Sequence, residues 1–228
     1  MKHKFQPVFT ASSLCYQTAD HVASPLILEN VFDAQLKKYR LTIRSTENAD
    51  GEMSFEMNMY ESKIIQDTTV ESAHPDENNA FGSTAFIGNS ELFGEQQLYI
   101  KFDYPRFTEM KNKHLVGIRL WLPILCGSTP LEAYEMDTRF CSFGSTWNKR
   151  IPPSSRKLPL TQRREFCCVD LSEIMIDQNG RLLFSNGLLL RAVSGFAGYC
   201  TLSTGDNYDT PVVLNANIYL KIKERQKE

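Results

Sequence analysis

The sequence predicts an all-β protein, an antiparallel β-sandwich of the jelly-roll kind with an N-terminal arm and β-hairpin extension. Many short segments alternate between apolar and polar residues, which is the pattern of a strand with one buried face. Loops rich in Gly, Pro, Ser and Asn separate these segments at residues 72–79, 144–157 and 205–211. The chain has 228 residues, of which 42% are hydrophobic, so it is long enough to bury its own core.

One segment near the middle of the chain shows the alternation most clearly. Leu98, Ile100 and Phe102 share one face of the expected strand, which we predict to be buried. Tyr99 and Lys101 lie on the opposite, polar face. We therefore expect these two side chains to point toward solvent.

A second segment, 115–122, has the same pattern. Its buried face is expected to carry Val116, Ile118, Leu120 and Leu122. Arg119 and Trp121 fall on the other face. Further strands are expected at 133–141, 165–171, 187–193, 199–203 and 211–223, and short helices at 29–39 and 172–177.

The first 60 residues differ in sequence pattern from the rest of the chain. Two alternating segments, 39–45 and 53–59, flank an Asp50-Gly51 pair. This pair predicts a hairpin, because glycine tolerates the positive φ that a tight turn requires. The expected units are an N-terminal arm and hairpin extension at 1–60 and a jelly-roll domain at 61–228. No flexible linker separates them, so we expect the hairpin to pack on, or join, the sheets that follow.

Four groups of residues resemble motifs of the DNRLRE-domain family, and they occur in the family's order. They are 67–78 with 81–84 and 87–88, then 98–103, then 145–148, and finally 188–191 with 211–214. The resemblance extends from about residue 63 to 223. It departs at Lys149, where the family usually has an acidic residue, and the Asp-Asn-Arg-Leu-Arg-Glu string itself is absent.

The resemblance implies a β jelly roll of the kind found in large, repetitive surface proteins, some of which bind polysaccharide. Members normally accompany an enzyme or an anchor, and neither is expected here. We therefore expect a non-catalytic structural or adhesive subunit that self-associates, or joins other surface subunits, in a spore, appendage, cell surface or virion. The alternative is a polysaccharide-binding module.

Charge and hydropathy argue against two classes of partner. The formal net charge is −2 and the basic stretches 150–164 and 221–227 are short, so we expect no nucleic-acid binding. No run approaches the ~20 apolar residues that cross a bilayer, so we expect no membrane span. The N-terminal residues lack the continuous apolar run of a secretory signal. We expect synthesis without a signal peptide and a place on a cell, spore or virion surface, with a cytoplasmic location left open.

The sequence predicts no catalytic residues. Four histidines are present, at His3, His21, His74 and His114. None lies in an HExxH motif, and no GxSxG nucleophile elbow occurs. His74 lies beside acidic residues in an expected loop, where a solvated histidine is the simpler interpretation. A polysaccharide-active enzyme whose carboxylates converge across strands is kept as a remote alternative.

Five residues are candidates for glycan binding, because sugar rings stack on exposed aromatic rings beside polar groups. They are Trp121, Tyr99, Arg119, Lys101 and Trp147. The first four form one platform if their two strands share a sheet, and Trp147 offers a second aromatic ring on a loop. In the competing interpretation, Trp147 caps one end of the sandwich and the N-terminal hairpin covers Trp121.

Two loop clusters carry the oxygen ligands that calcium prefers. They are Asp76, Glu77 and Asn78, and Asp206, Asn207 and Asp209. The same residue types also form turns. The six cysteines include no CxxC pair, so we expect no zinc site of the finger or ribbon type and no cofactor other than calcium.

Two cysteines are candidates for disulfides between subunits. Cys167 and Cys168 are neighbours, so their side chains point to opposite faces of the expected strand. Cys167 is in phase with Val169 and is expected to be buried, which leaves Cys168 nearer the surface. Cys15 lies in the arm, which could also add a strand to a neighbour's sheet edge. An arm folded over its own domain is the alternative.

Overall fold

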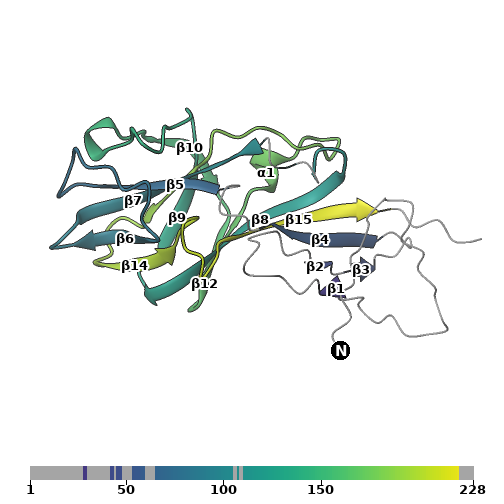
Figure 1. Cartoon of the computed structure of the whole chain (residues 1–228), viewed down its shortest axis with the longest axis horizontal. Coiled ribbons are helices and arrows are strands. Elements are labelled where there is room, and N and C mark those ends of the chain that lie inside the picture. The colour runs from purple at the N-terminus through teal and green to yellow at the C-terminus, as the bar shows by residue number, and fades with distance from the viewer. Residues whose placement is uncertain are drawn as a thin grey trace, which may run out of the picture.

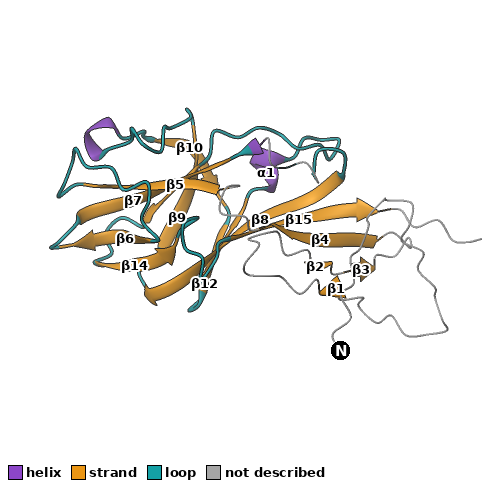
Figure 2. Cartoon of the chain, viewed as in Figure 1, coloured by secondary structure: helices purple, strands orange, loops and turns teal. Residues whose placement is uncertain are grey.

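The computed structural model describes residues 65–104, 107 and 110–220, together with four strands nearer the N-terminus. These strands are β1 (Leu28–Glu29), β2 (Thr42–Ile43), β3 (Ser45–Glu47) and β4 (Met53–Met59). The expected arm, most of the expected helix at 29–39 and the Asp50-Gly51 turn lie outside the described residues. The described part is all-β, and every strand pairing within it is antiparallel (Figure 2).

The main body follows from residue 65. Its strands are β5 (Ile65–Glu71), β6 (Thr84–Ser90), β7 (Gly94–Phe102), β8 (His114–Gly127), β9 (Leu131–Met136), β10 (Pro153–Leu158), β11 (Leu160–Gln162), β12 (Phe166–Asp170), β13 (Leu188–Ala192), β14 (Gly198–Ser203) and β15 (Val213–Leu220). The helices are the 3-10 turn η2 (Trp147–Lys149) and α1 (Ser172–Met175). The structure has a strand at each predicted position of the main body and a helical turn within 172–177, but the strand expected at 133–141 ends at Met136. β10 occupies part of an expected loop.

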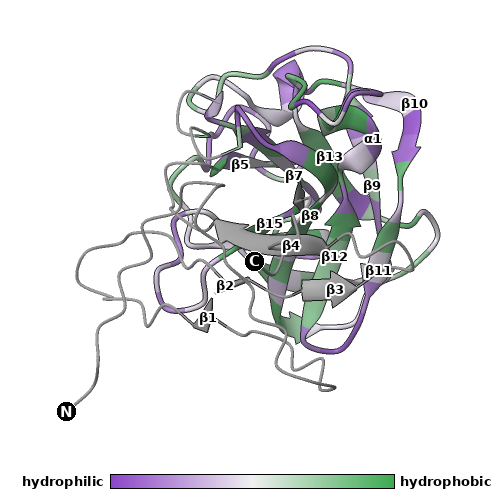
Figure 3. Cartoon of the chain, turned by 90° about the vertical axis from the view of Figure 1, so that its right-hand side faces the viewer, coloured by the Kyte–Doolittle hydropathy of each residue, from purple (hydrophilic) through white to green (hydrophobic). Residues whose placement is uncertain are grey.

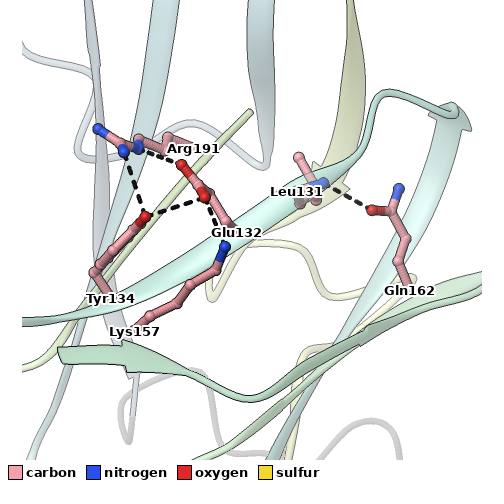
Figure 4. Close-up of polar contacts among 6 residues, drawn as sticks. All are labelled: Leu131, Glu132, Tyr134, Lys157, Gln162 and Arg191. Carbon is pink, nitrogen blue, oxygen red and sulfur yellow. Dashed lines mark hydrogen bonds and ion pairs between the residues drawn. The ribbon is translucent and has the colours of Figure 1, made fainter. Parts of the chain in front are cut away.

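The strand pairings make a nearly barrel-like circuit. β7 pairs with β13, β13 with β9, and β9 with β10. The chain then continues from β10 to β11 with only Pro159 between them, and β11 pairs with β12. From β12 the circuit returns to β7 through β8, β14 and β6. Gln162 of β11 reinforces the closure, because its Oε1 accepts the N–H of Leu131 at 2.9 Å (Figure 4).

The long strand β8 joins this body to a sheet that extends to one side of it (Figure 1). Residues 114–121 of β8 pair with β15, and β15 pairs in turn with β4 and β4 with β3. β4 coincides with the second strand of the predicted N-terminal hairpin, and its partner β3 begins at Ser45, where the first predicted strand ends. The pairing of β4 with β15 shows that this hairpin joins the following sheet.

The interior of the circuit is one continuous hydrophobic core. It includes Ile87, Leu98, Ile100, Leu120, Leu190 and Leu202, each at most 1% exposed. The predicted inward face of β7 is therefore confirmed. Figure 3 shows the contrast between the hydrophobic residues of β13 and the hydrophilic residues of β10, which among the described strands pairs with β9 alone.

The first half of β8 corrects one prediction. The sequence predicts that Val116 is buried, but this side chain is 46% exposed, whereas Leu115 is buried. Asn217 pairs with Gly117 and the next residue, Ile218, pairs with Leu115, so Val116 is the extra residue of a β-bulge. The bulge turns Val116 outward, and the inward residues beyond it are the predicted ones.

Candidate binding surfaces

The outer face of the sheet formed by β5, β7, β13, β9 and β10 is divided into a covered half and an open half. A loop at 137–152, here called the covering loop, packs on the covered half and forms a second hydrophobic cluster with it. Tyr99 is the anchor of this cluster and is 0% exposed, so the prediction that it points toward solvent is wrong. Its hydroxyl donates to the carbonyl of Ile151 and accepts the N–H of the same residue, both at 3.2 Å. Burial raises the pKa of Tyr99 to about 12, although the hydrogen bond with Ile151 and the charge of Arg150 oppose this shift.

Lys101 and Trp147 also belong to the covered half. Lys101 Nζ donates to the carbonyl of Phe140 at 3.2 Å and lies 5.1 Å from the centre of its ring. Trp147 is half-buried against the second cluster, and the Arg150 guanidinium lies 4.6 Å from the centre of its ring. Both side chains therefore hold the covering loop in place.

Arg119 and Trp121 lie in another part of the fold. Their strand β8 is separated from β7 by β6 and β14, and it pairs with β12 and β15 around these residues. Arg119 Nε is 3.6 Å from Asp170 Oδ2, and the ring of Trp121 packs 4.9 Å from that of Phe166. The two strands belong to one sheet, as the predicted platform required, but β6 and β14 lie between them and Tyr99 is buried. The structure therefore does not bring Tyr99, Lys101, Arg119 and Trp121 together into one platform.

The open half carries a polar network of four side chains, shown in Figure 4. Glu132 Oε1 accepts from Arg191 Nε at 2.8 Å, and Glu132 Oε2 accepts from Lys157 Nζ at 2.9 Å and from the Tyr134 hydroxyl at 3.1 Å. The strand register explains the gathering, because Glu132 lies opposite Arg191 and Tyr134 lies opposite Lys157. Sequence reasoning did not find this network, since its members come from three strands.

The polar network has a buried anion and two cations that are more exposed than the anion. The side chain of Glu132 is 8% exposed, compared with 32% for Arg191 and 58% for Lys157. Burial alone would raise the pKa of Glu132, but the hydrogen bonds from Lys157, Arg191 and Tyr134 outweigh it and hold this pKa below its ordinary value. The fixed carboxylate of Glu132 thus holds the Lys157 ammonium and the Arg191 guanidinium at the surface. The three ionised groups together carry a net charge of one positive unit.

A second surface, here called the aromatic face, consists of the partly buried rings of Phe86 and Phe93 and the exposed ring of Tyr199. The Phe86 and Phe93 rings stack with centres 4.8 Å apart, and the Tyr199 ring meets Phe86 edge-on at 5.8 Å. Tyr199 is 40% exposed, and Leu92 in the adjoining turn is 74% exposed. The exposed thiol of Cys126 lies at the margin, where its Sγ is 3.1 Å from Thr201 Oγ1.

Thr201 connects this thiol to the aromatic face. It lies between Cys126 of β8 and Phe86 of β6 in the strand register. Tyr199 lies opposite Gly88, whose φ is +140°. A Cβ on Gly88 would come within 2.3 Å of the Gly198 carbonyl, so only glycine allows β14 to approach this closely.

The first expected calcium cluster ties loops together. Asn78 Nδ2 donates to the carbonyls of Ser142 and Ser145 at 2.6 and 2.7 Å, and Asp76 Oδ1 accepts from Asn148 Nδ2 at 2.9 Å. Asn78 Oδ1 in turn accepts the N–H of Ala80. Glu77 gathers instead with Glu71 and His74.

The second expected calcium cluster builds a turn. Asn207 Oδ1 accepts the N–H groups of Asp209 and Thr210 at 3.1 and 2.9 Å, which is an ordinary Asx turn. Asp206 is partly buried, and burial raises the pKa of its carboxyl. The oxygen of Asn207 is thus already engaged by the backbone.

The structure changes the assignment of the cysteines. Cys168 is nearer the surface than Cys167, but at 8% exposed it is still buried, which does not favour its predicted disulfide between subunits. Cys15 lies outside the described residues. The predicted burial of Cys167 is confirmed, and burial, with smaller effects of Cys200 and Cys168, raises its pKa to about 12. Among the described residues, the exposed thiols are those of Cys126 and Cys141.

Comparison with known proteins leaves the family open. No protein-family model matches the chain, and no curated protein matches it. The resemblance to the DNRLRE-domain family therefore stays a prediction. No described helix has the length and apolar character that crossing a bilayer requires.

Proposed function

We propose that this chain is a non-catalytic structural or adhesive surface subunit, a jelly roll of the DNRLRE kind, that self-associates through its aromatic face. The observation that carries the proposal is the gathering of Phe86, Phe93 and Tyr199 beside the exposed Leu92. Leu92 and Tyr199 are exposed and the rings of Phe86 and Phe93 are partly buried. Apolar groups that gather at a surface mark interaction sites, and aromatic side chains are enriched in the centres of interfaces.

The position of Cys126 supports the same proposal. Its thiol is exposed next to Thr201, at the margin of the aromatic face. A contact between two copies that buries this face places a thiol at the rim of the interface. In an oxidising environment, dissolved oxygen would accept the two electrons and two protons of two Cys126 thiols, one from each copy, and the resulting disulfide would add a covalent link to the non-covalent contact.

Light scattering with size-exclusion chromatography tests the proposal. The wild type should form dimers or larger species at micromolar concentrations. Removing a central aromatic group typically weakens an interface by more than ~1 kcal/mol, so Tyr199→Ser combined with Leu92→Ser should raise the dissociation constant about tenfold or more. Val116→Ser, at an exposed apolar residue on a distant part of β8, is the matched control. A wild type that stays monomeric at high concentration would defeat the proposal.

A second candidate function, polysaccharide binding, is favoured by the polar network. Arg191 and Lys157 keep exposed donors while Glu132 fixes their positions, and the Tyr134 ring lies 4.9 Å from the guanidinium carbon. The excess positive charge suits a polysaccharide that carries carboxylate groups.

Affinity electrophoresis in gels that contain a polyuronate tests this second function. Lys157→Gln should reduce retardation, whereas Arg156→Gln should not, because Arg156 is the adjacent cation on β10 and pairs with Glu135 instead of Glu132. Raising the salt concentration should weaken retardation of the wild type. Equal migration of the wild type with and without polyuronate would remove this candidate.

A further inference from the structure

Three side chains with metal-binding atoms gather where β5 ends. Glu71 is the last residue of β5, and His74 and Glu77 follow in the next loop. Their ligand atoms all lie within 4.8 Å of one another. His74 Nδ1 lies 2.5 Å from Glu71 Oε1, so the imidazole and the carboxylate are in direct contact.

Glu71 is held in place from outside this group. It is 5% exposed, and its Oε2 accepts from Gln96 Nε2 at 2.6 Å. Gln96 is itself buried, lies opposite Glu71 in the β5–β7 register, and accepts the N–H of Phe86 at 2.8 Å. A carboxylate oriented by a buried amide in this way resembles the supported ligands of metal sites, whose outer hydrogen bonds fix the ligand's direction.

The loop that carries His74 and Glu77 is also fixed on both sides. The N–H of Ser72 donates to the carbonyl of Glu95 at 2.9 Å, and the N–H of Asn148 donates to the carbonyl of Pro75 at 3.0 Å. The N–H of Glu77 donates to the carbonyl of His74 at 3.1 Å, which closes a tight turn. The turn brings the two side chains to the same side as Glu71.

We propose that Glu71, His74 and Glu77 form a binding site for one divalent transition-metal ion, of which zinc is the best match. One imidazole nitrogen and two carboxylate oxygens suit zinc, whereas calcium prefers oxygen ligands alone. Zinc ligands at ~2.0–2.1 Å from the ion are about 3.3 Å apart in a tetrahedron. The exposed side chains of His74 and Glu77 adjust to this spacing around the buried, fixed Glu71.

The proposed site leaves one tetrahedral position open. Three protein ligands leave the fourth to water or to a group from outside the chain. The ion links the end of β5 to the loop at 72–77, and that loop contacts the covering loop through Pro75 and Asn148. Metal binding should therefore stabilise the folded chain, because the ion binds the assembled site and the unfolded chain lacks it.

Isothermal titration of the metal-free full chain with zinc chloride tests the proposal. The wild type should bind one zinc ion, and cobalt should give a visible absorption band in the same site. Glu71→Gln and His74→Ala should each weaken zinc binding at least tenfold to a hundredfold, the loss typical of removing even an outer hydrogen-bond partner of a ligand. Asp76→Asn is the matched control, because Asp76 is an acidic residue of the same loop outside the group. This variant should bind zinc like the wild type.

Two further measurements separate a metal site from a simple His–Glu ion pair. The imidazole resonances of His74 should shift on addition of stoichiometric zinc, and the melting temperature of the wild type should rise while that of His74→Ala should not. Circular dichroism of the metal-free variants establishes that they are folded. Absence of saturable zinc binding by the wild type, or an equal loss in Asp76→Asn and His74→Ala, would overturn the proposal.

Discussion

The two faces of the sheet formed by β5, β7, β13, β9 and β10 are built from the same strands but have different environments. The inner face is continuous with the core, through residues such as Leu98 and Leu190. The outer face is buried around Tyr99 and Leu189 and open around Glu132. The difference teaches that alternation along a strand fixes which residues share a face, whereas a loop from elsewhere in the chain decides whether that face meets water.

Replacing Tyr99 should have the largest effect on the covered half. Tyr99→Ala removes a fully buried ring, which typically costs about 3–5 kcal/mol of unfolding free energy. Tyr134→Ala, at the half-buried tyrosine of the open half, should cost less than ~1 kcal/mol. Urea unfolding of both variants measures the difference, and equal losses would remove the distinction between the two halves.

Asp67 is a buried carboxylate on the inner face, and it should make stability depend on pH. Burial is the main cause that raises the pKa of Asp67 to about 7, with the nearby Asp206 adding to it and the N–H of Gly205 opposing it. Since the folded-state pKa is above the unfolded value of 3.8, the protonated form is favoured by folding. The contribution of the protonated Asp67 to the free energy of unfolding is complete below about pH 4 and is lost as the pH rises through about 7.

Asp67→Asn should therefore be more stable than the wild type at pH 8, by up to ~4 kcal/mol if each pKa unit contributes about 1.4 kcal/mol. The advantage should shrink as the pH falls toward 4. Urea unfolding at a series of pH values measures both trends. A wild type that gains stability relative to Asp67→Asn as the pH rises would show that the sign is wrong.

Asn78 sharpens the comparison by testing what ties down the covering loop. Asn78→Ala removes the donor to the carbonyls of Ser142 and Ser145, which should cost about 1–3 kcal/mol. Asn148→Ala removes a single exposed contact with Asp76 and should cost less than ~0.5 kcal/mol. Thermal unfolding compares the two, and a larger loss in Asn148→Ala would argue against the role of Asn78.

The open half should tolerate substitution of its charged centre best. Glu132→Gln keeps hydrogen-bond acceptance but removes the charge that pairs with Lys157 and Arg191. Because both cations are partly exposed, water and salt compensate most of the loss, and we expect a cost of about 1 kcal/mol or less. The cost should shrink further in high salt. If Glu132→Gln lowered the unfolding free energy more than Asn78→Ala does, the polar network would be a major contributor to the stability of the fold, which would contradict this prediction.

The sequence predicted where the strands lie along the chain much better than which strands pair with each other. Alternation located β7 and β12 and the inward direction of Ile100, because period two is a local property. It failed at Val116, where a bulge inserts one residue. It also missed β5 and β6 as strands, and it placed a loop where β10 lies.

The candidate sites depended on contacts that no local pattern contains. Glu132 and Arg191 are 59 positions apart in the chain, and Tyr99 meets Ile151 across 52. By contrast, Glu71, His74 and Glu77 are spaced by three residues, so their proximity could have been suspected from the sequence. What the sequence did not reveal is that Gln96 orients Glu71, since that contact depends on the β5–β7 register.

Amide hydrogen exchange at Ile151 tests most directly whether the covering loop is an integral part of the fold. The N–H of this residue donates to the buried Tyr99 hydroxyl. Its exchange in the wild type should be slowed to a rate comparable with that of the amides in β7, and Tyr99→Phe should speed it selectively. Exchange of Ile151 as fast as in an unfolded peptide would contradict the division of the outer face.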